Sequence, residues 1–274
     1  MEVKIGGKVK RFRKLAAATA FITALAGTST GATAAVPGNT VLVGDSIVAN
    51  PTVADYVLNK AHKKANTGVG CVTDNAIANE MSHVSGAHVD QYQCPGASFA
   101  TGGIHVDDSL RKAAADGNLS HQTKNVVIVA GANDTYPYKA DIAASDRAIR
   151  GGLRSALNIA HQHAPNAKVI VASYPQVARG NTTCLTSSMI PLPIAAVSDT
   201  EQRLRNTLRE VSEQNGATFL DAHPMSDGHD MCSPHRWWVN LVDPLPPAPG
   251  NLPLHLNAHG TAAYGQFIGH ALRK

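Results

Sequence analysis

The chain has 274 residues, of which 24 are Lys or Arg, 20 are Asp or Glu and four are Cys. Six of the basic residues and one acidic residue lie within the first 34 positions, so the rest of the chain has 18 basic and 19 acidic side chains. This balance excludes the strongly basic surface on which nucleic-acid binding depends, and we predict no nucleic-acid partner.

The first segment, residues 1–34, has the three parts of a secretory signal peptide. A basic stretch runs into an apolar run from Leu15 to Ala26, and small residues follow as far as Ala34. That order is typical of exported proteins, and the apolar run is too short to span a bilayer comfortably. We predict cleavage after Ala34, a secreted or cell-envelope-associated product, and no membrane span in the remainder. An uncleaved membrane anchor is the alternative.

Residues 35–274 contain no long Gly/Ser linker and no repeated unit, which predicts one domain. We expect it to be a monomer. Its even number of cysteines, in a chain sent to an oxidising compartment, predicts two disulfides. Three pairings are formally possible. We favour the pairing of sequence neighbours, Cys71 with Cys94 and Cys184 with Cys232.

Short β-branched runs alternate with helical patterns along the chain, which predicts a parallel sheet covered by helices on both faces. The predicted strands are Thr40–Val43, Val89–Gln93, Asn125–Ala130, Ala167–Ser173 and Ala217–Leu220. The predicted helices are Ala140–His163, one that starts at a capping box of Ser198 and Glu201, and one from Asn257 to the C-terminus.

Two apolar, Pro-rich segments interrupt this alternation, residues 185–197 and 237–254. Loops of this size in compact domains are usually functional or disordered, and their apolar content disfavours disorder. We therefore predict that they form walls of a binding site. The tandem residues Trp237 and Trp238 lie at the start of the second segment and are expected to pack there, with substrate contact as the alternative.

Residues suited to acyl transfer follow several predicted strands. Ser46 comes directly after the first strand, Gly96 follows the second and Asn133 the third, while His255 stands near the C-terminus. The carboxyl ends of parallel strands share one edge of a sheet, where ligands bind. A serine nucleophile, an imidazole base, a glycine N–H and a side-chain amide are the groups that acyl transfer requires. Each motif alone is more typical of a turn or a helix cap.

Together, these motifs resemble the SGNH (GDSL-type) hydrolase family. The match extends over nearly all of residues 35–274 in order, with Gly-Asp-Ser-Ile at Ser46, Pro-Gly-Ala-Ser at Gly96, Gly-Ala-Asn-Asp at Asn133 and His-Leu-Asn-Ala-His-Gly at His255. The resemblance implies a flavodoxin-like, three-layer α/β/α fold with a five-stranded parallel sheet. It is greatest to secreted actinobacterial lipases and esterases, whose disulfides also join neighbouring cysteines.

The resemblance also implies roles for the residues. Ser46 would attack the ester carbonyl, and His255 would accept its proton. The backbone N–H groups of Ser46 and Gly96 and the amide of Asn133 would form the oxyanion hole. The family usually has an Asp three residues before the histidine, whereas Leu252 occupies that position here. We therefore predict that a main-chain carbonyl near Leu252 orients His255, with Asp243 as the alternative.

Three hypotheses about function follow. The first is a secreted carboxylic-ester hydrolase that acts on lipid or other acyl esters and needs no metal or cofactor. The second keeps the chemistry but makes the protein a deacetylase or acyltransferase on cell-envelope glycans, and the third is a catalytically silent binding module. The spacing of His229, Cys232 and His235 is compatible with a metal site, but a disulfide at Cys232 would remove its thiolate.

Overall fold

The computed structural model describes residues 36–62, 65–137, 141–186, 190–243 and 250–273. The predicted signal peptide, residues 1–34, and its cleavage point lie outside the described residues. The elements, in chain order, are β1 (Thr40–Gly44), α1 (Ser46–Ala49), α2 (Val53–His62), α3 (Ala76–Ser85), β2 (Val89–Gln91), α4 (Val106–Ala115), β3 (Asn125–Val129), η1 (Ala132–Asp134), α5 (Ile142–His163), β4 (Lys168–Ala172), α6 (Ala195–Gln214), β5 (Thr218–Leu220), η2 (Pro224–Ser226) and α7 (Ala258–Leu272).

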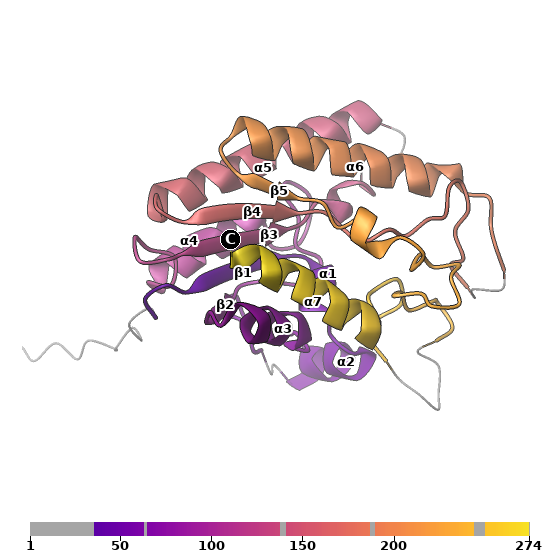
Figure 1. The fold of residues 1–274 in the computed structure, drawn as a ribbon, viewed down its shortest axis with the longest axis horizontal. Coiled ribbons are helices and arrows are strands. Elements are labelled where there is room, and N and C mark those ends of the chain that lie inside the picture. The colour runs from indigo at the N-terminus through magenta and orange to yellow at the C-terminus, as the bar shows by residue number, and fades with distance from the viewer. Residues whose placement is uncertain (1–35, 63–64, 138–140, 187–189, 244–249, 274) are drawn as a thin grey trace, which may run out of the picture. The chain divides into compact units, whose positions relative to one another are not determined.

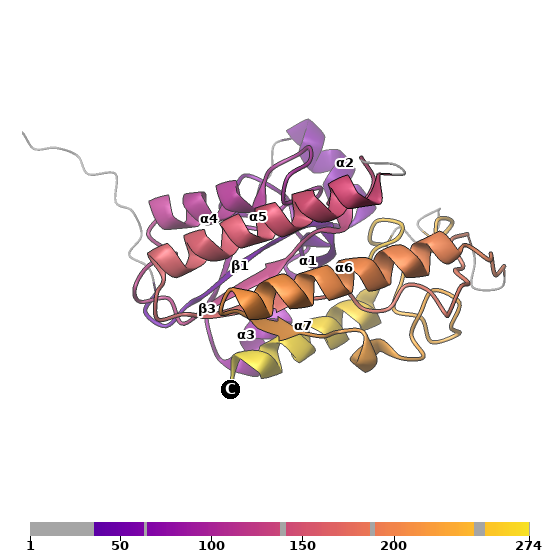
Figure 2. The ribbon, with the colours of Figure 1, turned by 90° about the horizontal axis from the view of Figure 1, so that it is seen from above.

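The five strands form one parallel sheet in the order β2-β1-β3-β4-β5. Helices α4, α5 and α6 cover one face of the sheet, and α3 and α7 cover the other (Figures 1 and 2). The predicted three-layer α/β/α fold with five parallel strands is therefore confirmed. All five predicted strands are present, with ends that differ by no more than a few residues.

Beyond their first residue, the central strands β1, β3 and β4 have no polar side chain, because both of their faces are buried. On β1, Val41 and Val43 belong to the core cluster beneath α4, α5 and α6, whereas Leu42 belongs to the cluster beneath α3 and α7. Strand β3 alternates in the same way, and every one of its side chains is buried. Each fully buried Val, Leu or Ile contributes about 1.5–3 kcal/mol to folding.

Helix α7 lies close against α3, and glycines permit this approach. A Cβ atom at Gly265 would lie 2.6 Å from the Cβ of Glu80, and one at Gly269 would lie 2.8 Å from the Cβ of Val84. Side chains larger than hydrogen at these positions would push the two helices apart. This packing fixes the start of α7, which directly follows the His255 segment.

Two features of the helical layers differ from the sequence prediction. Helix α6 begins at Ala195, so Ser198 lies inside it and does not cap it. The Oγ of Ser198 bonds to the carbonyl of Ala195, and the carboxylate of Glu201 accepts hydrogen bonds from the backbone N–H groups of residues 177 and 178. The ten-residue helices α2, α3 and α4 were not predicted.

Both disulfides join the predicted neighbours, Cys71 with Cys94 and Cys184 with Cys232. Among the described helices, none has the length and apolar character needed to cross a membrane.

Candidate active site

The nucleophile candidate lies in the turn between β1 and the short helix α1. Gly44 ends β1 so close to β3 that a Cβ there would collide with the carbonyl oxygen of Val129. Asp45 caps α1 by accepting a hydrogen bond from the backbone N–H of Ile47 at 2.9 Å. Ser46 is therefore the first residue of α1, partly exposed, and its backbone N–H has no hydrogen-bond partner among the described residues. A free N–H at a helix start favours negative charge nearby.

A second turn, after β3, contains Asn133 and lies against the turn of Gly96. The Nδ2 of Asn133 donates one hydrogen bond to the carbonyl of Ala97 at 2.8 Å, which leaves its second hydrogen available. Gly96 has a φ of +82°, a backbone conformation that favours glycine. This bond joins the Asn133 turn to the turn of Gly96 through Ala97, the residue that follows Gly96.

Asp134 holds these two turns together and was not singled out from the sequence. Its side chain is fully buried and accepts hydrogen bonds from the backbone N–H groups of Phe99, Ala100 and Thr101 at 2.8, 2.9 and 3.1 Å. A buried carboxylate with several N–H donors is a strong local anchor. The signal for it in the sequence is only that it follows Asn133.

His255 lies in the turn before α7, and the two nitrogens of its ring have different surroundings. Nδ1 lies 2.8 Å from the carbonyl oxygen of Pro253. A carbonyl can only accept, so Nδ1 carries the hydrogen and Nε2 keeps its lone pair. Nε2 is buried and has no hydrogen-bond partner among the described residues. Burial lowers the pKa of His255 below its ordinary value, and the bond to Pro253 opposes this.

A main-chain carbonyl lies at the imidazole, one residue beyond Leu252, and the alternative group, Asp243, lies elsewhere. The carbonyl that meets the imidazole belongs to Pro253, whereas that of Leu252 accepts a hydrogen bond from the backbone N–H of His255 at 3.2 Å. Asp243 does not contact the ring. Its carboxylate pairs with Arg236 at 3.0 Å and accepts from the backbone N–H of Asn240 at 2.7 Å.

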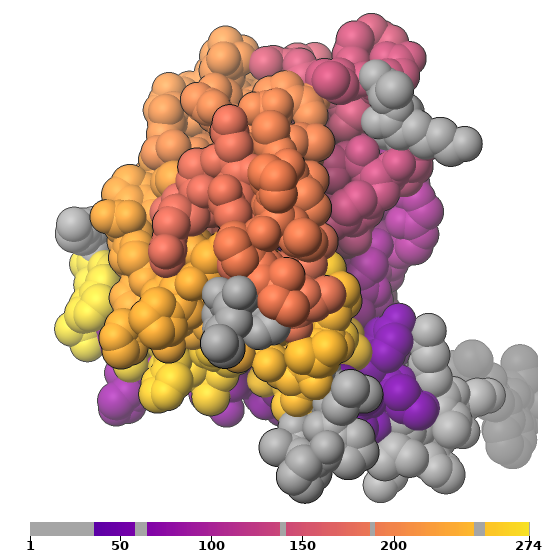
Figure 3. All heavy atoms as spheres, turned by 90° about the vertical axis from the view of Figure 1, so that its right-hand side faces the viewer, coloured from indigo at the N-terminus to yellow at the C-terminus, as the bar shows by residue number. Residues whose placement is uncertain are grey.

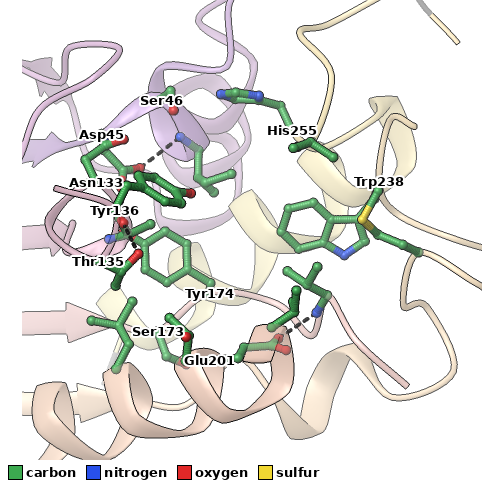
Figure 4. A pocket seen from close by; sticks show the side chains of 18 of the residues that line it. Asp45, Ser46, Asn133, Thr135, Tyr136, Ser173, Tyr174, Glu201, Trp238 and His255 are labelled. Carbon is green, nitrogen blue, oxygen red and sulfur yellow. Dashed lines mark hydrogen bonds between the residues drawn. The ribbon is translucent and has the colours of Figure 1, made fainter. Parts of the chain in front are cut away.

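A cavity of about 560 Å³ brings Ser46, Asn133 and His255 together. Figure 4 shows Ser46 and the imidazole of His255 next to each other at one end, with Ser173 and Glu201 at the other. Gly96 does not line this cavity and is connected to it through the bond between Asn133 and Ala97. Apolar side chains form most of the wall between the two ends, among them Ile47, Val177, Leu185, Leu204, Met231 and Trp238.

Both Pro-rich segments contribute to this cavity, as predicted. The first supplies Leu185 and Val197, and the second supplies Trp238, Pro253 and Leu254. The two segments lie side by side on the face where the strands end (Figure 3). The backbone N–H of Leu241 donates to the carbonyl of Leu185 at 2.8 Å, which joins them directly. Residues 187–189 and 244–249 of these segments lie outside the described residues.

The histidines near Cys232 have other contacts. His229 stacks on Trp237 with ring centroids 4.2 Å apart, and its Nδ1 lies 2.7 Å from the carbonyl oxygen of His235. Cys232 is bonded to Cys184. Trp238 is buried, donates through Nε1 to the carbonyl of Gln176 at 2.7 Å and lines the cavity.

The site thus has the parts of a serine hydrolase: a hydroxyl at a helix start, an imidazole with a free lone pair beside it, and N–H donors around them. Residues 42–263 match the GDSL-like lipase/acylhydrolase family, and the chain belongs to that family.

Two curated relatives come from Streptomyces coelicolor. The chain is 32% identical over 114 residues to Lipase 2, a match that covers 39% of this chain and 37% of the relative. It is 28% identical over 107 residues to Lipase 1, a match that covers 37% of this chain and 39% of the relative. The chain therefore matches well under half the length of each relative.

Solved structures with the same fold include phospholipase A1 from Streptomyces albidoflavus, with a TM-score of 0.64, 19% identity, and coverage of 86% of this chain and 99% of that one. The extracellular lipase of Streptomyces rimosus matches with a TM-score of 0.60 and 17% identity. This match covers 85% of this chain and 99% of the lipase. At these identities the likeness shows a shared fold.

Proposed function

We propose that this chain is a secreted serine esterase that cleaves carboxylic esters of lipids or other acyl compounds. The observation that carries the proposal is the state of His255. Its Nδ1 is held by the Pro253 carbonyl, and its Nε2 is buried, unbonded and in the same end of the cavity as Ser46. An imidazole held in that tautomer can accept the serine proton.

The proposed reaction has two steps. In the first, the Oγ of Ser46 attacks the ester carbonyl carbon, and Nε2 of His255 takes its proton. The negative oxygen of the tetrahedral intermediate is held by the backbone N–H groups of Ser46 and Gly96 and by Nδ2 of Asn133. The C–O bond to the alcohol then breaks, and the protonated imidazole donates its proton to the leaving alcohol.

In the second step, water attacks the acyl-enzyme with His255 again as base, and Ser46 is released with a carboxylic acid as product. Each donor of such an oxyanion hole is worth about 3 kcal/mol of transition-state stabilisation.

The apolar wall of the cavity supports a substrate with an acyl chain longer than acetyl. Side chains such as Val177, Leu185 and Met231 would gain from burial against methylene groups, at about 0.8 kcal/mol per buried CH₂. A deacetylase would leave this wall without contact. The family membership and the two lipase relatives support ester cleavage in general.

An ester panel of graded acyl length, run on the wild type and on Ser46→Ala, tests this proposal. We expect hydrolysis that increases beyond acetyl and is abolished in Ser46→Ala. Ser198→Ala, a serine within α6, serves as the matched control and should keep full activity. Activity on acetylated glycans alone would favour the deacetylase, and cleavage of no ester by the wild type would favour a binding module.

Secretion and a monomeric state are part of the same proposal. The two disulfides support an oxidising compartment. N-terminal sequencing of protein from the culture medium should begin at Ala35, and size-exclusion chromatography with light scattering should give the mass of one chain. An uncleaved N-terminus in the membrane fraction would contradict the secretion proposal.

A further inference from the structure

A buried hydroxyl joins the two turns that carry Ser46 and Asn133. Tyr174 lies just beyond the end of β4 and lines the cavity (Figure 4). Its hydroxyl contacts one residue from each turn. It donates a hydrogen bond to Oδ2 of Asp45 and accepts one from the backbone N–H of Ala132 at 3.1 Å. Asp45 directly precedes Ser46, and Ala132 directly precedes Asn133.

The direction of both bonds is fixed by chemistry. A backbone N–H can only donate, so the oxygen of Tyr174 is the acceptor toward Ala132, and its single hydrogen points to the carboxylate of Asp45. The other oxygen of Asp45 accepts from the N–H of Ile47. One hydroxyl therefore links the cap of α1 to the start of η1.

The hydroxyl of Tyr174 has a role beyond the packing of its ring, because it donates to a buried carboxylate. Asp45 is only 1% exposed, and burial raises its pKa to about 7 in spite of the bonds from Tyr174 and Ile47. A carboxylate is costly to bury, and it is tolerated where its oxygens have donors. Tyr264 is a useful contrast, because it is also fully buried but its hydroxyl donates to the carbonyl of Ser173 at 2.7 Å and forms no hydrogen bond with either turn in the described part of the chain.

We propose that Tyr174 is a positioning residue for ester hydrolysis, whose hydroxyl sets the nucleophile turn and the Asn133 turn at the spacing that the oxyanion hole requires. The inference rests on the proposed function. Oxyanion donors act only if they lie about 2.7–3.1 Å from the developing charge. Without the hydroxyl, the two turns lose their common partner, and the donors of Ser46 and Asn133 shift relative to each other.

The expected effect is on turnover. Donors that act on the transition state alone affect kcat and leave ground-state binding unchanged. Complete loss of one donor costs about 10²–10³-fold in kcat, so misplacement of a donor should cost about 10–100-fold. Tyr174→Phe keeps the ring that lines the cavity and should therefore keep KM within about twofold.

The test compares Tyr174→Phe with Tyr264→Phe, which also removes one buried tyrosine hydroxyl. Rates on a p-nitrophenyl ester, divided by the number of active sites, should show the loss of kcat in Tyr174→Phe alone. The inhibition constant of an alkyl boronic acid, which forms a tetrahedral adduct at Ser46, should rise by the same factor. That of the corresponding carboxylic acid should not change. Asp45→Asn leaves one acceptor oxygen for the two donors, the Tyr174 hydroxyl and the N–H of Ile47. It should lower kcat in the same way and provides the test if Tyr174→Phe fails to fold.

An unchanged kcat in Tyr174→Phe, or an equal loss in Tyr264→Phe, would overturn the inference. So would a loss that appears in KM alone. These outcomes are distinct from failure of the proposed function, because that would appear as no ester hydrolysis by the wild type or as hydrolysis that survives in Ser46→Ala.

Discussion

The orientation of His255 by a carbonyl gives a sharp prediction for Asp243→Asn. The nearest carboxylate before His255 in the sequence is that of Asp243, but the structure pairs it with Arg236 and with the backbone N–H of Asn240. The imidazole contacts Pro253 instead. We therefore expect Asp243→Asn to keep kcat within about threefold of the wild type.

The cost to stability follows from the ion pair. The Arg236 and Asp243 side chains are 27% and 33% exposed, so their attraction is screened by water and contributes about 0.2–1 kcal/mol. An Asn side chain still has an oxygen that can accept from the N–H of Asn240. For a domain of this size, the melting temperature should fall by about 2–4 °C per kcal/mol lost.

A triad carboxylate would give a very different result. Loss of such a group lowers kcat by about 10⁴-fold, which corresponds to about 5.5 kcal/mol in activation free energy. Steady-state hydrolysis of a p-nitrophenyl ester separates the two cases easily. Asp227→Asn, at an exposed carboxylate, is the matched control. A thousandfold loss of kcat in Asp243→Asn, with an unchanged circular dichroism spectrum, would refute the carbonyl assignment.

Three further predictions concern pH and stability. The acid limb of kcat/KM should have its midpoint below the ordinary pKa of 6.5, because burial favours neutral His255; a midpoint above 6.5 would contradict this. Denaturant unfolding should show that Cys184→Ala/Cys232→Ala, which opens a loop of 48 residues, loses about 4 kcal/mol in the free energy of unfolding. Cys71→Ala/Cys94→Ala, which opens a loop of 23 residues, should lose about 3 kcal/mol, and equal losses or the reverse order would contradict this prediction. Burial raises the pKa of Glu201 from 4.5 to about 7, so its stabilising contribution is complete below pH 4.5 and is lost as pH rises through 7. Glu201→Gln should therefore gain about 1–3 kcal/mol relative to the wild type between pH 5 and pH 8, and a difference independent of pH would refute this.

The sheet could be predicted because its signal is local. Strands such as Asn125–Val129 are buried on both faces, so they are continuous apolar runs that stand out in the sequence. The convergence of Ser46 and Asn133 then follows from the geometry of parallel strands, whose carboxyl ends share one edge. His255 precedes α7 and follows no strand of the sheet, so this rule does not place it.

The sequence did not predict the contacts between residues that are far apart along the chain. Glu201 has the spacing of a capping box but accepts hydrogen bonds from the backbone N–H groups of residues 177 and 178. Asp134 and Tyr174 act through partners more than 30 positions away. No local pattern distinguishes such residues from an ordinary turn Asp or core Tyr.

The carbonyl that holds His255 depends on a backbone conformation that the sequence does not predict. Leu254 has a φ of +61°, which is uncommon for a residue other than glycine and costs of order 1 kcal/mol. Residues 244–249 of the second Pro-rich segment lie outside the described residues. In the described part, pairing with residues 237–239 holds the turn.

Three backbone bonds make this pairing. The N–H of Leu254 donates to the carbonyl of Val239, that of Val239 to the carbonyl of His255, and that of Asn257 to the carbonyl of Trp237, each at 2.8 Å. A turn held on both sides can keep a strained residue in place, and the strain places the Pro253 carbonyl at Nδ1. In the proposed mechanism, rigidity of the main chain thus provides the orientation of His255 that a carboxylate provides in a triad, without adding a second buried charge beside Ser46.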